Sequence, residues 1–218
     1  MIKAVLFDLD ETLLDRTATV EAYLKDQCQR YNLNRLAFKA YRDRFIELDE
    51  HGYADKHKVF RTLIMEFDLP ASVEQLVADF RQNAWKDCKT FPDAERVLRQ
   101  LRTRGYRLGI VTNGSIVSQR AKLLSSGLAE LVEEVLISGE EKVKKPDVEI
   151  FVRAAERLGV RVEESVFVGD NPQTDIAGAH TAGMKTVWLN RHLAWPEDLS
   201  VVPDYTLSSL AELLVIGL

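Results

Sequence analysis

The chain has 218 residues, 46% of them hydrophobic and 29% charged, which is enough to bury a full core and to leave room for a smaller inserted unit. A formal net charge of −5 argues against a general nucleic-acid binder, because such proteins normally carry a basic excess. The two cysteines, Cys28 and Cys88, lack metal-ligand spacing and indicate reduced thiols. The first apolar run is too short and too charged for a signal peptide, and no stretch approaches a membrane span. We therefore expect a cytoplasmic protein without nucleic-acid or membrane partners, and the oligomeric state stays open.

Short apolar runs rich in branched residues recur along the chain and predict strands that are buried on both faces of a sheet. The runs cover residues 4–7, 108–112, 135–138, 166–169 and 186–189. Helical patterns separate several of them, at residues 94–104, 116–126, 149–158 and 175–182, and each is followed by a glycine suited to a helix C-terminus. Strands that alternate with helices in this way predict an α/β fold with a parallel sheet and right-handed crossovers.

The stretch between the first and second runs has helical periodicity and no convincing strand. Apolar residues recur there in three stripes: Leu36, Phe38, Tyr41, Phe45 and Leu48; Phe60, Leu63, Ile64 and Phe67; and Leu76, Val77, Phe80 and Ala84. Ser72 and Gln75 fit a capping box, so a helix is expected to begin there. The sequence thus predicts a helical domain of residues 16–88, inserted into a core domain of residues 1–15 and 89–218.

Two aspartates, Asp8 and Asp10, follow the first predicted strand in the segment FDLDET. In an open parallel sheet, ligands bind at the carboxyl ends of the strands, and other predicted strands also end in polar residues. Thr112 and Asn113 follow the second strand, and Asp170 follows the fourth. Each residue alone is more often a helix cap or a solvated loop residue. Their shared position at one edge of the sheet favours a common site.

Asp8, Asp10 and Asp170 would bring three carboxylates into one cleft, where they repel one another unless a cation or protons compensate. A divalent ion with oxygen ligands fits this set, and Mg²⁺ suits a sparse site that has no His or Cys. A lysine of the segment KVKKPD and the amides of the turn in VTNG would add positive charge and hydrogen-bond donors. Together these groups describe a site for a phosphoryl group.

Four segments, in this order, resemble the motifs of the haloacid dehalogenase superfamily of hydrolases: DLDET at residues 8–12, VTNG at 111–114, KKPD at 144–147 and GDNPQTD at 169–175. The resemblance spans residues 2–189. It implies a Rossmann-like core with the motif strands at its centre. It also implies that the inserted helices form a type 1 cap domain.

The resemblance implies a role for each matching residue. Asp8 would attack phosphorus and form an aspartyl-phosphate, while Asp10 would protonate the leaving oxygen and then activate water. Thr112 would hold a phosphoryl oxygen, and Lys145, which directly precedes Pro146, would neutralise charge on the transferred group. The turn residues expected to bind the same phosphoryl group are Asn113 and Gly114.

The same resemblance implies a metal site. The expected ligands of Mg²⁺ are side-chain oxygens of Asp8 and Asp170 and the main-chain carbonyl of Asp10. Asp175 would orient the lysine or a water molecule outside the metal ligands.

The implied function is hydrolysis of a small phosphomonoester, such as a nucleotide or a sugar phosphate, by a magnesium-dependent phosphatase. Dehalogenases of the superfamily typically lack the second aspartate of the first motif, which is Asp10 here, so phosphate chemistry is favoured. Phosphosugar mutases of the beta-phosphoglucomutase type share all four motifs and the cap, so mutase activity is an alternative. A non-catalytic phosphate-binding regulatory domain is a weaker alternative, because such a domain is shorter or has lost Asp8 or Asp10.

Substrate specificity is expected to come from the helical insert, in the segment LDEHGYADKH. Gly52 could serve as a hinge of this segment, and Tyr53, Lys56 and His57 offer polar contacts to a substrate. The alternative interpretation is an ordinary connection between two helices.

Overall fold

The computed structural model describes residues 1–33 and 38–217. Leu36, one member of the predicted apolar stripes, lies outside these residues. The chain divides into two compact units: a core unit of Met1–Asp15 and Cys88–Leu218, and a helical unit of Arg16–Asp87. Within the described residues, no helix is long and apolar enough to cross a membrane.

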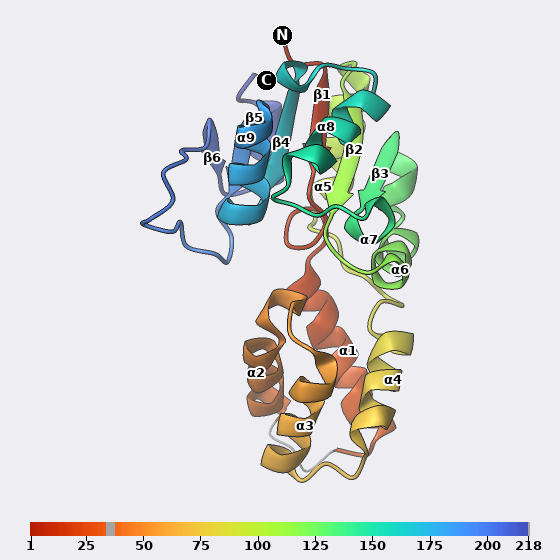
Figure 1. Ribbon diagram of the computed structural model, residues 1–218. Helices are drawn as coiled ribbons and strands as arrows, with labels where there is room; N and C mark the ends of the chain where they lie inside the picture. The colour runs from red at the N-terminus through yellow and green to blue at the C-terminus, as the bar shows by residue number, and fades with distance from the viewer. Residues whose placement is uncertain (34–37, 218) are drawn as a thin grey trace. The chain divides into compact units, whose positions relative to one another are not determined.

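The core unit contains a six-stranded parallel sheet with strand order β3-β2-β1-β4-β5-β6 (Figure 1). The strands are β1 (Ala4–Phe7), β2 (Arg107–Thr112), β3 (Glu134–Ile137), β4 (Ser165–Gly169), β5 (Lys185–Leu189) and β6 (Tyr205–Leu207). The predicted α/β fold with a parallel sheet is therefore confirmed. The sequence did not predict β6, because this edge strand has three residues and only one of them is buried.

The strand β1 lies at the centre of the sheet, between β2 and β4. Phe7, its last residue, pairs with Ile110 of β2 and with Val168 of β4. All four residues of β1 are buried, which explains the unbroken apolar run AVLF. The register therefore brings the carboxyl ends of these three strands to the same edge of the sheet.

Helices cover the sheet of the core unit. They are α5 (Ala94–Thr103), α6 (Ile116–Ser126), α7 (Ser138–Glu141), α8 (Val148–Arg157) and α9 (Gly178–Ala182), with 3-10 turns at Leu128–Leu131, Val162–Glu164 and Leu210–Leu214. The helices α8 and α9 contact each other, and both lie in front of the strands in Figure 1. Phe151 of α8 meets Phe167 of β4 edge to face, with ring centroids 5.0 Å apart. Each large apolar side chain buried in this core stabilises the fold by about 1.5–3 kcal/mol.

The segment after β4 differs from the prediction of a helix over residues 175–182. A π-helical segment, Pro172–Ala177, precedes α9, and Asn171 caps it by accepting hydrogen bonds from the amides of Gln173 and Thr174. The helical structure therefore begins three residues before Asp175, and Asn171 instead of Asp175 caps it.

The helical unit consists of α1 (Arg16–Arg30), α2 (Phe38–Asp49), α3 (Lys56–Phe67) and α4 (Val73–Asn83), with a 3-10 turn at Glu50–Gly52. Its interior is aromatic, since Phe80 contacts the rings of Phe45 and Phe60 with centroids 5.9 and 6.1 Å away. The predicted capping box is confirmed: the Gln75 amide donates to the Ser72 hydroxyl, and the Ser72 amide donates to the Gln75 side chain.

Backbone hydrogen bonds join the two places where the chain leaves and re-enters the core unit. Leu14 and Thr90 form an antiparallel bridge. On either side of it, the Asp15 amide donates to the Lys89 carbonyl at 2.8 Å, and the Phe91 amide donates to the Leu13 carbonyl at 3.0 Å. The two ends of the insert are thus held side by side within the core unit.

Candidate active site

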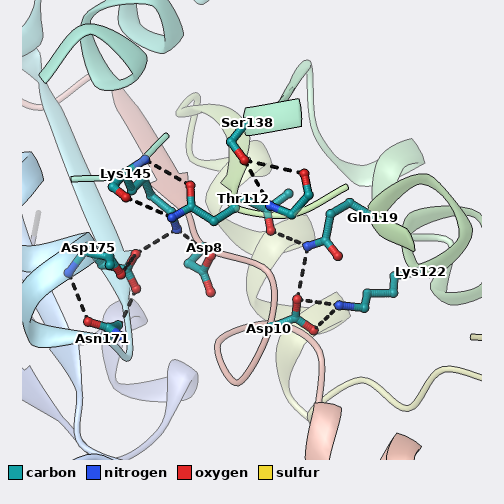
Figure 2. Close-up of polar contacts among 12 residues, drawn as sticks. Asp8, Asp10, Thr112, Gln119, Lys122, Ser138, Lys145, Asn171 and Asp175 are labelled. Atoms are coloured by element: carbon teal, nitrogen blue, oxygen red, sulfur yellow. Dashed lines mark hydrogen bonds and ion pairs between the residues drawn. The ribbon is translucent and has the colours of Figure 1, made fainter. Parts of the chain in front are cut away.

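A chain of buried charges lies at the carboxyl edge of the sheet (Figure 2). The ammonium of Lys145 lies 2.5 Å from Oδ1 of Asp8 and 2.7 Å from Oδ1 of Asp175. Asp8 directly follows β1, and its amide donates to the Val168 carbonyl, which extends the pairing with β4 by one residue. The neighbouring lysines, Lys142 and Lys144, are exposed, whereas the Lys145 side chain is 2% exposed.

The side chain of Asn113 holds the backbone of Lys145. Its amide nitrogen donates to the Lys145 carbonyl, and its carbonyl oxygen accepts from the Lys145 amide, both at 2.9 Å. Asn113 therefore fixes the segment that carries the lysine. A contact of Asn113 with substrate stays a prediction, and one N–H and the carbonyl oxygen of its side chain are already hydrogen-bonded to Lys145.

Three carboxylates lie close together next to the ammonium of Lys145. Asp8, Asp170 and Asp175 are buried, and each offers an oxygen atom within 4.8 Å of the others. Asp175, which was predicted to orient the lysine or a water molecule outside the metal ligands, thus belongs to the acidic cluster itself. Its second oxygen accepts from the amide of Asn171 at 3.1 Å. A Cβ at Gly169 would collide with Asp175, so a glycine is required where this side chain approaches β4.

The pKa values show that this cluster has more negative charge than its surroundings compensate. Burial raises the pKa of Asp8 to about 7, although Lys145 acts to lower it. Burial also raises the pKa of Asp170 to about 9, and the charges of Asp175 and Asp8 add to the shift. Burial acts to lower the pKa of Lys145, but Asp175 and Asp8 outweigh it and the net shift is upward. A single lysine is insufficient for three buried carboxylates, and an all-oxygen donor set of this kind fits a magnesium ion.

Asp10 belongs to a different cluster of the same edge, which also contains Thr112. Two side chains of α6 contact it: Nζ of Lys122 lies 2.9 and 2.7 Å from the two carboxylate oxygens, and Nε2 of Gln119 donates to Oδ2 at 3.1 Å. Gln119 also donates to Oγ1 of Thr112 at 2.5 Å. Figure 2 shows Gln119 between Thr112 and Asp10.

The sequence did not identify Gln119 or Lys122. Both lie on the buried face of α6, three residues apart, next to the buried Leu123. Two polar residues on a helix face that packs inward were the available signal, since such residues are rarely buried without a partner.

The predicted cap residues lie in the helical unit. The ammonium of Lys56 lies 2.7 Å from Oδ1 of Asp49, a carboxylate that also pairs with Arg16, and 5.7 Å from the centre of the Phe80 ring. Lys56 is thus engaged inside the helical unit. Tyr53 is 65% exposed, and Gly52 has a φ of +98°, a conformation that favours glycine.

The comparisons with known proteins agree with this geometry. The family model described as haloacid dehalogenase-like hydrolase matches residues 2–183. A glyceraldehyde 3-phosphate phosphatase of Methanopyrus kandleri is 36% identical over 98% of this chain and 96% of its own length. A phosphoserine phosphatase of Thermus thermophilus is 32% identical over 97% of both chains.

A solved structure with the same fold is the HAD-hydrolase YfnB from Bacillus subtilis bound to magnesium. It matches with a TM-score of 0.77 at 26% identity and covers 97% of this chain and 96% of its own. The predicted superfamily and the predicted phosphatase class are confirmed by these relatives, which match over almost the full chain. The chain belongs to the haloacid dehalogenase-like hydrolases.

Proposed function

We propose that this phosphatase depends on Mg²⁺ and hydrolyses a small phosphomonoester through an aspartyl-phosphate on Asp8. The observation that carries the proposal is the position of the Asp8 carboxylate, in contact with buried Lys145 and beside Asp170 and Asp175. The relatives named for glyceraldehyde 3-phosphate and for phosphoserine support three-carbon phosphate esters as the first substrates to test.

The metal would bind to Asp8, Asp170 and the main-chain carbonyl of Asp10. When bound, Mg²⁺ would supply the positive charge that the buried carboxylates lack and would neutralise oxygens of the phosphoryl group. Asp175 would keep the ammonium of Lys145 directed at the Asp8 carboxylate, where the phosphoryl group is transferred.

The reaction requires one nucleophile and one group that carries a proton. An oxygen of Asp8 attacks phosphorus, the bond from phosphorus to the leaving oxygen breaks, and protonated Asp10 gives its proton to that oxygen. Asp10, now ionised, takes a proton from water as the water oxygen attacks the phosphorus of the intermediate. Phosphate leaves, Asp8 is regenerated as a carboxylate, and Asp10 is protonated again. Lys145, the hydroxyl of Thr112 and the amide of Asn113 would stabilise the phosphoryl oxygens throughout, whereas the Gly114 amide already donates to the Ser138 hydroxyl.

Release of inorganic phosphate from 4-nitrophenyl phosphate and from three-carbon phosphate esters tests this function, in buffers with Mg²⁺ and with a chelator. We expect turnover only with Mg²⁺, and a loss of about 1,000-fold or more in Asp8→Asn, which lacks the nucleophile. Asp198→Asn makes the same chemical change at an exposed position and should retain full activity. Turnover in the chelator or undiminished turnover in Asp8→Asn would sink the proposal, and interconversion of a hexose phosphate without phosphate release would favour a mutase.

A further inference from the structure

Two polar side chains of α6 lie almost fully buried against the site. Gln119 is 1% exposed and Lys122 is 4% exposed. Because residues three positions apart lie on the same face of a helix, both side chains are directed toward the sheet edge that carries Asp10 and Thr112. Burying a lysine costs free energy unless its charge is paired, so its position calls for an explanation.

Gln119 orients the hydroxyl of Thr112. Asp10 accepts hydrogen bonds through its carboxylate, so the NH₂ group of Gln119 faces both Asp10 and Oγ1 of Thr112. A hydroxyl has one proton and two acceptor lone pairs. Since the amide of Gln119 donates to one lone pair, the hydroxyl proton of Thr112 is left to be donated elsewhere, as binding of a phosphoryl oxygen requires.

Lys122 orients the carboxyl group of Asp10. Its ammonium contacts both oxygens, at 2.9 and 2.7 Å, which fixes the rotation of the carboxyl plane as well as its position. Gln119 adds a third contact to Oδ2. Asp10 is thus held from the side of α6, and Lys145 is held separately by Asp8 and Asp175.

The backbone around Thr112 makes room for this arrangement. Gly114 has a φ of +149°, and a Cβ at this position would lie 2.9 Å from Cγ of Gln119. The amide of Gly114 donates to the hydroxyl of Ser138, which holds the turn in place. A residue larger than glycine would displace Gln119 from Thr112 and Asp10.

We propose that Gln119 and Lys122 are positioning residues for the phosphatase reaction: Gln119 directs the hydroxyl of Thr112 at the phosphoryl group, and Lys122 with Gln119 holds Asp10 in line with the leaving oxygen. This inference rests on the proposed function, because it assigns these residues to the partners of Asp10 and Thr112 in that reaction.

A comparison of leaving groups tests the role of Lys122. A nitrophenolate ion leaves without a proton, whereas the oxygen of an alkyl ester must be protonated as it leaves, so loss of a well-placed proton donor affects the alkyl ester more. In Lys122→Met we expect kcat for glycerol phosphate to fall by about 10-fold or more, and kcat for 4-nitrophenyl phosphate by less than about threefold. Lys122→Arg should restore part of the lost kcat for glycerol phosphate. Asp10→Asn, which removes the proton donor itself, shows how the two rates respond when no donor is present.

Arg120→Met is the matched control for this experiment, because it removes a cation from the same helix at a position that is 66% exposed. It should leave both rates unchanged. Equal losses for the two esters in Lys122→Met, or no loss for either, would overturn the role of Lys122. Thermal unfolding of each variant excludes a general loss of folding. An inactive wild-type protein or an active Asp8→Asn variant refutes the proposed function instead.

Binding of inorganic phosphate in the presence of Mg²⁺, followed by calorimetry, tests the role of Gln119 without any turnover. We expect Gln119→Met and Thr112→Val each to weaken phosphate binding by about 10-fold, the size of one hydrogen bond to a charged group. If Gln119 acts through Thr112, the double variant binds phosphate no more weakly than Thr112→Val alone. Multiplied effects in the double variant, or unchanged binding in Gln119→Met, would overturn this role. Gln119→Leu is the replacement if the first variant does not fold.

Discussion

At the scale of single residues, the site separates its charges into two groups. Lys145 forms ion pairs with Asp8 and Asp175, while Lys122 and Gln119 donate hydrogen bonds to Asp10. Two aspartates only two residues apart thus have different electrostatic surroundings: two other carboxylates lie beside Asp8, whereas Asp10 contacts its own lysine.

Replacement of Lys145 by methionine should lower kcat by about 100- to 1,000-fold, the effect of removing one charged group that stabilises a transition state. The reason is that no other buried cation contacts Asp8 among the described residues. Lys144→Met, a change at the adjacent exposed position, is the control and should retain activity. Steady-state kinetics with one phosphate ester distinguishes the two variants. Similar rates in both would contradict the role assigned to Lys145.

The raised pKa values of Asp8 and Asp170 predict how Mg²⁺ binding depends on pH. In an unfolded chain these carboxyls ionise near pH 3.9, whereas in the folded protein without metal they hold protons until about pH 7 and about pH 9. The metal-free protein therefore loses stability as pH rises through this window, and Mg²⁺ must restore it. The rise in Tm caused by Mg²⁺ should be larger at pH 9 than at pH 6. Thermal unfolding with Mg²⁺ and with a chelator measures it, and a rise that is independent of pH would contradict the prediction.

Asp170→Asn is the control for the same measurement. It removes the carboxyl with the higher pKa, so most of the pH dependence should disappear together with the response to Mg²⁺.

At the scale of elements, the path from β4 into the π-helical segment places Asp175. Its amide donates to the carbonyl of Asn171, and its carboxylate returns to accept from the amide of the same residue. The acidic cluster therefore depends on one tight connection as well as on the side chains themselves.

Gly169→Ala should disturb this connection. The added methyl group would collide with the Asp175 side chain, so we expect a loss of about 1–3 kcal/mol in the free energy of unfolding and a fall in kcat of about 10-fold or more. Gly109→Ala is the control, because its methyl group would collide with Leu6 inside the core, away from the site. The control should lose stability but keep its kcat. Urea unfolding and steady-state kinetics of both variants give the comparison, and an unchanged kcat in Gly169→Ala would contradict it.

At the scale of the whole molecule, the protein has two separate interiors. The residues of the candidate site that converge around Asp8 and Asp10 all belong to the core unit, while the aromatic cluster of Phe45, Phe60 and Phe80 belongs to the helical unit. Stability of the helical unit and binding of Mg²⁺ should therefore be separable.

Phe80→Ala should destabilise the helical unit by about 3–5 kcal/mol, because it leaves a cavity among four aromatic rings, those of Tyr23, Phe45, Phe60 and Trp85. The stabilisation of the core unit by Mg²⁺ should persist. Urea unfolding followed by circular dichroism, with and without Mg²⁺, measures both effects. Met65→Ala, an 80% exposed position of α3, should change stability by less than about 0.5 kcal/mol. Loss of the response to Mg²⁺ in Phe80→Ala would show that the units are not separable.

The sequence predicted the strands of the core unit more completely than the contacts within the candidate site. Continuous apolar runs identified five of the strands within one residue, because strands buried on both faces carry their own signal. The π-helical start at Pro172 was missed, since a proline and an Asn cap are also typical of an ordinary helix.

For the site, the motifs indicated which side chains share an edge, and the structure adds which of them are in contact. Asp8 contacts Lys145, and Asp10 contacts Lys122. Each lysine lies more than one hundred residues from its aspartate in the sequence, so these pairings depend on how the chain packs at the strand ends. The polar residues on the inward face of α6 indicated that Gln119 and Lys122 have partners, but the sequence pattern could not identify Asp10 and Thr112 as those partners.

The bridge between Leu14 and Thr90 closes the core unit at the point where the helical unit is inserted. Paired strands lie about 5 Å apart, so this junction requires of an insert only that its two ends lie about that distance apart. The length, composition and secondary structure of the insert are free to vary, because the hydrogen bonds at the junction use backbone atoms only. The junction therefore constrains the separation of the two ends of the insert and leaves its sequence unconstrained.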